Sequence, residues 1–172
     1  MKKVILFLIC LIYMSQLNAQ DIFLASRTDN VAMMDSLFQA DATLDLDAVD
    51  EKGFSALILA VYNNSEHVTP YLLSKGAAVD FQDKHGNTAL MGATFKGNLP
   101  MVKLLVENQA DINKKNSNGA TALIYAATFG QKDIGAFLLE NGAVKSFKDN
   151  RGNTAFDHAI MQEHIELIKL LK

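Results

Sequence analysis

The sequence contains little cysteine, little proline and no tryptophan. Its 172 residues include one cysteine and two prolines. A single cysteine cannot form a disulfide within the chain, so packing alone must hold the fold together. The one cysteine, Cys10, lies in an apolar run near the N-terminus. Without that run the chain has no thiol, which excludes thiol catalysis and thiolate metal sites.

An excess of positive charge is also missing. The chain has 16 basic and 19 acidic residues, and without Lys2 and Lys3 the balance becomes 14 to 19, a net charge of −5. This balance excludes nucleic acid as an expected partner. Hydrophobic residues make up 49% and charged residues 20%, proportions typical of one globular domain with a sizeable core.

The first 19 residues have the pattern of a secretory signal peptide. Lys2 and Lys3 are followed by the apolar run from Val4 to Met14 and then by a short polar stretch. The run is too short for a membrane span, which needs about 20 apolar residues. We expect cleavage after Ala19, so that the mature chain begins at Gln20. An uncleaved anchor is the alternative.

Similar segments recur at a constant interval of 33 residues. Each opens with glycine and ends with Ala-Leu or Ala-Phe, and the four copies start at Gly53, Gly86, Gly119 and Gly152. A second string, such as Tyr71-Leu-Leu-Ser-Lys-Gly-Ala, follows in register, and the last copy is truncated at Leu170-Leu-Lys. A degenerate unit precedes them, with Leu24-Ala25 matching Leu59-Ala60. Each apolar segment is too short for a stable isolated helix, so neighbouring units must supply the core by stacking.

This pattern of Asp-x-x-Gly-x-Thr-x-Leu, then Ala-Ala-x-x-Gly, then Leu-Leu-x-x-Gly-Ala resembles the ankyrin repeat. The resemblance implies an all-α solenoid of about five helix-turn-helix units with projecting β-turn fingers. The expected organisation is a signal peptide helix over 1–19 and a repeat domain over 20–172, with units at about 21–49, 50–82, 83–115, 116–148 and 149–172.

The chain departs from the family where a Thr-Pro-Leu-His tetrapeptide is usual. Proline and histidine are missing from all four copies of this tetrapeptide. In the family that histidine contributes hydrogen bonds between turns. We therefore expect more of the cohesion between repeats to come from the apolar residues Ile58, Met91 and Ile124.

The stretch His-Gly-Asn-Thr-Ala-Leu-Met-Gly-Ala-Thr-Phe-Lys-Gly-Asn, residues 85–98, contains half of a phosphate-loop pattern. Gly92 and Gly97 have the right spacing, but Asn98-Leu99 stands where a phosphate loop needs Lys-Ser/Thr. The repeat instead predicts that Gly86 closes a finger turn, Gly92 allows close helix packing, and Gly97 ends a helix.

Other candidate chemistry is also weak. The four histidines do not pair at ligand spacing, and we expect His158 to make local hydrogen bonds. The acidic run from Asp41 to Glu51 lacks the ordered spacing of a calcium loop, so a solvated terminal cap is favoured. No serine stands in a Gly-x-Ser-x-Gly elbow. The sequence predicts no catalytic site, cofactor or metal.

The resemblance implies partner binding through the concave face of the first helices and through the fingertips. Carried over by position, the concave set is Tyr62, Asn63, Phe95, Lys96, Phe129 and Met161, and the fingertip set is Lys52, Phe54, Lys84, His85, Asn118 and Arg151. Large exposed aromatics are typical interface anchors. The alternative is that Tyr62, Phe95 and Phe129 fill grooves between repeats and belong to the core.

The function expected from these features is an exported, non-enzymatic protein that binds an unidentified protein partner as an adaptor, inhibitor or protective chaperone. We expect a monomer, periplasmic or secreted, with no membrane contact after signal cleavage. The alternatives are an enzyme whose active site is hidden in the repeat scaffold and a purely structural component of the cell envelope.

Overall fold

The computed structural model describes residues 21–172, and the expected signal peptide lies outside the described residues. The chain divides into two compact units. The first unit ends at Ala77, and the second runs from Ala78 to Lys172. Each is considered by itself below.

The first unit contains two pairs of short helices. Residues 21–27 are helical and precede α2, Val31–Ala40, and the second pair is α3, Ala56–Tyr62, and α4, Val68–Ser74. Helix α4 packs against both α3 and α2. The stretch between α2 and α3 contains one isolated antiparallel bridge, between Val49 and Ser55.

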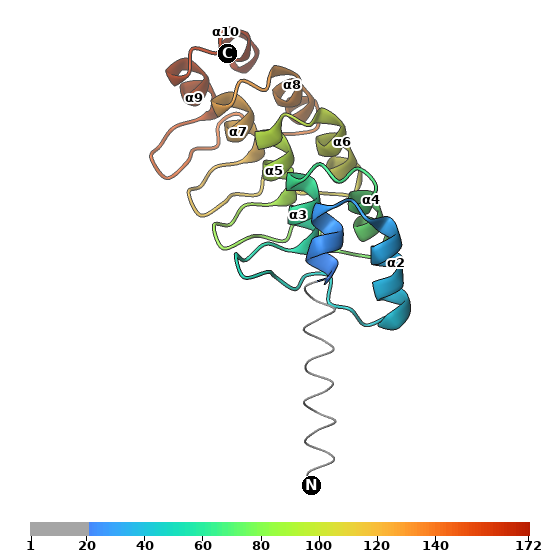
Figure 1. Ribbon diagram of the computed structural model, residues 1–172. Coiled ribbons are helices and arrows are strands. Elements are labelled where there is room, and N and C mark those ends of the chain that lie inside the picture. The colour runs from blue at the N-terminus through green and yellow to red at the C-terminus, as the bar shows by residue number, and fades with distance from the viewer. Residues whose placement is uncertain (1–20) are drawn as a thin grey trace. The chain divides into compact units, whose positions relative to one another are not determined.

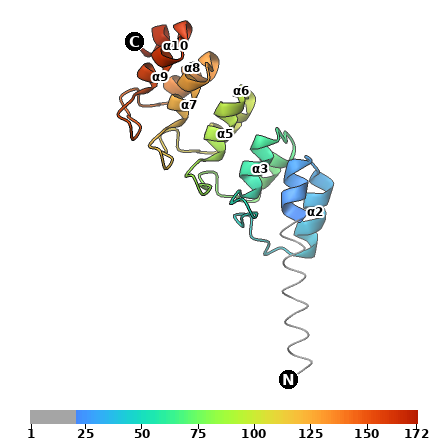
Figure 2. The same cartoon turned by 60° about the vertical axis from the view of Figure 1, so that its left-hand side comes forward.

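The second unit is a stack of three helix pairs (Figure 1). The pairs are α5, Ala89–Lys96, with α6, Leu99–Glu107; α7, Ala122–Thr128, with α8, Lys132–Glu140; and α9, Ala155–Met161, with α10, Ile165–Leu171. First helices pack on first helices, α5 on α7 on α9, and second helices on second helices, α6 on α8 on α10. The loops before α7 and α9 project from the helix pairs in both views (Figure 2). The helices and their order confirm the all-helical repeat architecture.

The first helices begin at one repeated position. Ser55, Thr88, Thr121 and Thr154 are the N-cap residues of α3, α5, α7 and α9. In each case the side-chain hydroxyl accepts a hydrogen bond from the backbone N–H three residues later. This bond satisfies one of the N–H groups that a helix start leaves unpaired. The hydroxyl of the repeat motif therefore sets where each first helix starts.

The glycine-rich stretch is part of a repeat, as the sequence predicted. Gly86 has a φ of 74° and closes a turn, and Gly97 ends α5 with a φ of 71°. Both angles are in the left-handed region that favours glycine. A Cβ on Gly86 would lie 2.7 Å from the backbone nitrogen of Ser117, so the next turn packs directly against it. Gly92 is buried within α5. The helix removes the row of free N–H groups that a phosphate loop needs.

The core repeats with the same period. Leu72, Leu105 and Leu138, spaced 33 residues apart, are each 0% exposed. Ile58, Met91 and Ile124 are buried as well, in the repeat positions where the family usually has histidine. Full burial of a leucine contributes about 1.5–3 kcal/mol relative to leaving it exposed. Helices of 7 to 10 residues are therefore stabilised mainly by packing against each other.

Among residues 21–172, none of the helices combines the length and apolarity that crossing a bilayer requires.

Candidate functional site

Each first helix from α3 onwards is preceded by a tight turn, and we call these the finger turns: residues 50–54, 83–87, 116–120 and 149–153. Each begins with Asp or Asn, whose Oδ1 accepts the backbone N–H groups two and four residues later. In the second turn, Asp83 Oδ1 accepts from His85 and Asn87, both at 2.8 Å. The side-chain oxygen of the opening residue accepts hydrogen bonds from backbone N–H groups that would otherwise bind water, and this fixes the turn.

In the first unit the predicted aromatic residues lie against each other. The rings of Phe54, on the finger turn, and Tyr62, at the end of α3, have centroids 6.2 Å apart. Both side chains are half-buried. Lys52 and Asn63 are exposed, but Asn63 Nδ2 donates to Leu59 O at 2.8 Å, so this amide also caps its own helix.

In the second unit two predicted aromatic residues form an exposed pair. Phe95 lies in the last turn of α5, and Phe129 follows α7 as its C-cap. Their ring centroids are 4.8 Å apart at 89°, an edge-to-face contact, yet the residues are 42% and 44% exposed. Tyr125 contacts Phe129 with a centroid distance of 5.9 Å. Edge-to-face packing holds the rings in place while leaving apolar surface open.

The remaining predicted partner-binding residues are all exposed. Met161, the last residue of α9, is 58% exposed. Also exposed are Lys84, His85, Lys96, Asn118 and Arg151. Exposure makes these side chains accessible to a partner, although it does not single any of them out.

A neutral hydrogen-bond network joins the second and third finger turns. Asn116 Nδ2 donates to Asn87 Oδ1 at 2.8 Å, and Tyr125 OH donates to the same oxygen at 2.9 Å. Burial raises the pKa of the Tyr125 hydroxyl, so it remains a donor at neutral pH. The backbone adds a further link, because Ser117 N donates to His85 O at 3.0 Å. The network holds two consecutive repeats in register.

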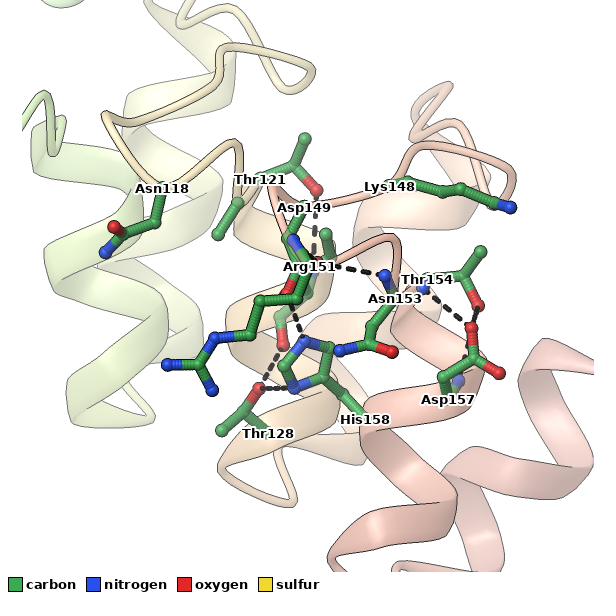
Figure 3. Close-up of polar contacts among 12 residues, drawn as sticks. Asn118, Thr121, Thr128, Lys148, Asp149, Arg151, Asn153, Thr154, Asp157 and His158 are labelled. Atoms are coloured by element: carbon green, nitrogen blue, oxygen red, sulfur yellow. Dashed lines mark hydrogen bonds and ion pairs between the residues drawn. The ribbon is translucent and has the colours of Figure 1, made fainter.

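An ionisable bridge lies at the fourth finger turn (Figure 3). His158 Nε2 lies 2.9 Å from Asp149 Oδ2, and Nδ1 lies 3.2 Å from Thr128 Oγ1 on the preceding first helix. Burial raises the pKa of Asp149, but the hydrogen bonds from His158, Asn153 N and Arg151 N outweigh this and hold it below its ordinary value. His158 therefore makes the local hydrogen bonds that the sequence predicted.

These turns and helices enclose an open groove of about 300 Å³, which we call the α7–α9 groove. Its lining comes from the third and fourth finger turns, from α7 and from α9: Asn116, Asn118, Ala120, Ile124, Tyr125, Thr128, Phe129, Asp149, Asn150, Arg151 and His158. Three residues of the predicted set, Asn118, Phe129 and Arg151, are thus brought to one site.

Sequence reasoning predicted local hydrogen bonds for His158 but did not place His158 or Tyr125 in the candidate site. Tyr125 and His158 occupy the same repeat position, nine residues after the Asp or Asn that opens their finger turn. Each side chain bonds to that opening residue, Tyr125 to Asn116 and His158 to Asp149. Alignment at the 33-residue period shows the shared position. The sequence offers no signal for the links to Asn87 and Thr128, because these depend on how the repeats stack.

No three His, Asp or Glu side chains of residues 21–172 gather as a possible metal site. The arrangement of this part of the chain is a surface of fixed turns and exposed rings that includes the α7–α9 groove. Such a surface is suited to binding another molecule.

The family model described as "Ankyrin repeats (3 copies)" matches residues 22–116 and 97–172, which together span all but one of the described residues. Proteins built from these repeats are generally protein–protein interaction modules and are typically not enzymes. A search of curated proteins found no significant match to the sequence.

Proposed function

Because this chain belongs to the ankyrin-repeat family, we propose that it binds one protein partner through the first-helix surface and finger turns of its second unit, without catalysis of its own. The observation that carries this proposal is the exposed edge-to-face pair of Phe95 and Phe129 on consecutive first helices.

The pair has the properties of an interface anchor. Most side chains of α5 and α7 are buried, yet these two rings keep more than two fifths of their surface exposed. Covering large aromatic surface is favourable, and truncating a central aromatic anchor costs about 2 kcal/mol or more in binding. Because each ring already restrains the other, a partner loses little additional entropy in ordering them.

The finger turns support the same proposal. Asp83, Asn116 and Asp149 fix their turns through side-chain bonds to the backbone, so the turns need no rearrangement to present their exposed tips. Preorganised loops bind more tightly because the cost of ordering them has been met during folding.

The experiment that tests the proposal is affinity capture with the purified repeat domain. We compare the wild-type chain, the double variant Phe95→Ala/Phe129→Ala and the control Ile165→Ala. Ile165 is an equally apolar side chain, 58% exposed, but it lies on the second helix α10. A specific partner should be retained by the wild type and the control, and lost by the double variant.

Equal retention of the partner by all three proteins would show that the aromatic pair is not the anchor. Circular dichroism and urea unfolding are measured for each variant. A double variant that unfolds would place the two rings in the core, which was the alternative interpretation of the sequence.

We further propose that the protein acts outside the cytoplasm, in the periplasm or after secretion, as a monomer that serves as an adaptor, inhibitor or protective chaperone. Lys2, Lys3 and the following apolar run support export. Mass spectrometry of the protein from each cell fraction tests cleavage after Ala19, and light scattering tests the monomer. A full-length mass of 18.9 kDa in every fraction would contradict cleavage.

A further inference from the structure

The α7–α9 groove contains one carboxylate, and its hydrogen-bonding capacity is already used. Asp149 Oδ1 accepts from Arg151 N and Asn153 N, both at 2.9 Å, and Oδ2 contacts His158 Nε2. The carboxyl side chain is 9% exposed. These bonds direct the carboxylate toward its own turn and toward His158, so it presents little surface to a ligand.

The groove also contains one cation of fixed charge, and this one is not paired. Arg151 is exposed, and among residues 21–172 its guanidinium group makes no hydrogen bond or ion pair. In Figure 3 no dashed line reaches this group, while the backbone of Arg151 is held by Asp149. The finger turn thus fixes the base of the side chain and leaves five N–H donors available.

Part of the groove lining is apolar. Phe129 is 44% exposed, and Ile124 and Ala120 are buried. Asn118, on the neighbouring finger turn, is exposed and contributes a polar side chain to the rim. A volume of about 300 Å³ fits one or two side chains and no large ligand.

We propose that the α7–α9 groove binds an aspartate or glutamate side chain of the partner protein, with Arg151 as its counter-ion and an apolar residue beside it packed on Phe129. This inference rests on the proposed function and specifies the partner's chemistry. The complementarity of charge supports it, since Arg151 is exposed and its guanidinium is unpaired among residues 21–172, whereas the Asp149 side chain is only 9% exposed. A planar guanidinium matches a carboxylate with two parallel hydrogen bonds.

A carboxylate fits this groove better than a phosphate group. A phosphate dianion is most stable between several cations, but the lining contains no lysine and no second arginine. Lys148 is on the same loop, yet Figure 3 shows its side chain directed away from Arg151. One partner carboxylate therefore matches the one guanidinium of this lining.

The probe is a set of capped peptides in which Phe and Glu are adjacent or separated by one or two glycines, with a matched set containing Gln. Binding to the isotope-labelled repeat domain is followed by NMR. For at least one spacing we expect signals of Phe129 and Arg151 to shift, and the Glu peptide to bind about tenfold more tightly than its Gln counterpart.

Arg151→Gln should remove the preference for Glu and leave binding of the Gln peptide unchanged. Lys148→Gln, which removes a cation of the same loop outside the groove, should keep the preference. Asp149 is bonded to the backbone of Arg151 and not to its guanidinium group, so Arg151→Gln should keep the wild-type unfolding profile.

Three results would overturn the inference. These are an equal affinity for Glu and Gln peptides, a Glu preference that survives Arg151→Gln, or an equal loss in Lys148→Gln, which would indicate long-range attraction only. The proposed function is tested separately by Phe95→Ala/Phe129→Ala. Loss of the captured partner there, combined with no Glu preference, would leave the protein-binding function standing and exclude the carboxylate site.

Discussion

The two units of the chain use different chemistry to join consecutive repeats. In the first unit the links include ionised carboxylates: Asp29 Oδ1 accepts from His67 N and Val68 N, and Oδ2 lies 2.7 Å from His67 Nδ1. In the second unit most links are neutral amides, such as Asn116 to Asn87 and Asn150 Nδ2 to Ser117 O at 2.9 Å. We therefore expect the links between repeats to depend on pH more strongly in the first unit than in the second.

The acidic composition of the first unit is part of this difference. Besides Asp29, Asp50 pairs with Arg27 at 2.6 Å, and Asp35 accepts from the Tyr71 hydroxyl at 2.6 Å. Burial and the neighbouring Asp35 raise the pKa of Tyr71 to about 12, so this hydroxyl stays protonated. Of the acidic run that sequence analysis assigned to a solvated cap, Asp50 instead makes an ion pair within this unit.

The largest expected loss of stability comes from truncating the buried leucines, which both units share. This loss is the reference for the polar links. Leu72→Ala and Leu138→Ala remove equivalent side chains that are 0% exposed. Each should lower the free energy of unfolding by about 2–5 kcal/mol through lost burial and the cavity left behind. Urea unfolding followed by circular dichroism measures the loss at pH 5.5 and at pH 8.5.

The loss should be the same at both pH values, because no ionisable group is removed. Val144→Ala, a truncation at an exposed position, is the control and should cost much less. A loss of stability that changes with pH would show that core packing and the polar links do not contribute independently.

The next effect tests the neutral network of the second unit. Asn116→Ala removes the acceptor for Asn118 N and Ala120 N and the donor to Asn87. We expect a loss of about 1–3 kcal/mol in unfolding free energy, because buried partners are left unsatisfied. Asn118→Ala is the control, since among residues 21–172 its hydrogen bonds are made by the backbone.

This loss should not change between pH 5.5 and pH 8.5. The proposed difference between the units would be wrong if the stability lost in Asn116→Ala depended on pH as strongly as the stability lost on removing a carboxylate link of the first unit.

A smaller effect, with a defined sign, tests the ionic link of the first unit. The hydrogen bond and charge of Asp29 raise the pKa of His67 above 6.5. Stability from a raised pKa is fully present below 6.5 and is lost as the pH rises through the folded-state value. His67→Gln should therefore lower Tm relative to wild type at pH 5.5, and this difference should shrink by pH 8.5.

The Asp29–His67 pair also stops stabilising the fold at low pH, because Asp29 then becomes protonated. Burial raises the pKa of Asp29, but hydrogen bonds from His67 and Val68 outweigh it and lower the net value. The stabilisation from Asp29 is fully present above pH 3.8 and is lost as the pH falls through its lowered pKa.

For His67→Gln, a loss of Tm relative to wild type that grows from pH 5.5 to pH 8.5 would contradict the predicted sign.

The smallest effect is expected for a surface ion pair of the second unit. Glu166→Gln removes contacts of 2.8 Å to Lys169 and 3.9 Å to Lys132, all with more than half of the side chain exposed. Such pairs contribute little because water screens them. Thermal unfolding should give a Tm equal to that of wild type at low and at high salt.

A clear drop in Tm for Glu166→Gln at low salt would show that charge alone stabilises the chain. The stronger effect expected for Asp29 could then not be attributed to the hydrogen bonds that it accepts from backbone N–H groups.

Much of the fold followed from the sequence because the period fixes local geometry. Gly86 and Gly97 could be assigned as turn and helix end, since left-handed glycines act within a few residues. The capping role of Thr88 was not predicted. The family resemblance placed Phe95 and Phe129 on the concave face with burial between repeats as the alternative, and in the structure both are exposed.

The candidate site was predicted less completely. Placing Phe129, Asn118 and Arg151 on the surface required only the repeat alignment, whereas their common groove also depends on the polar residues Tyr125 and His158. Each of these two side chains has one partner in its own repeat, nine residues away, and another in a different repeat, 30 or 38 residues away. No local pattern encodes such a contact.

The sequence by itself determined the repeat and the apolar positions of the core, because these depend on backbone propensity and burial within one unit. Only the tertiary structure decided that Phe95 meets Phe129 edge to face, that Asn116 and Tyr125 share Asn87, and that Arg151 has no counter-ion among residues 21–172. These outcomes depend on the offset with which one repeat stacks on the next. That offset is the result of packing across the whole interface and is not a property of any single residue.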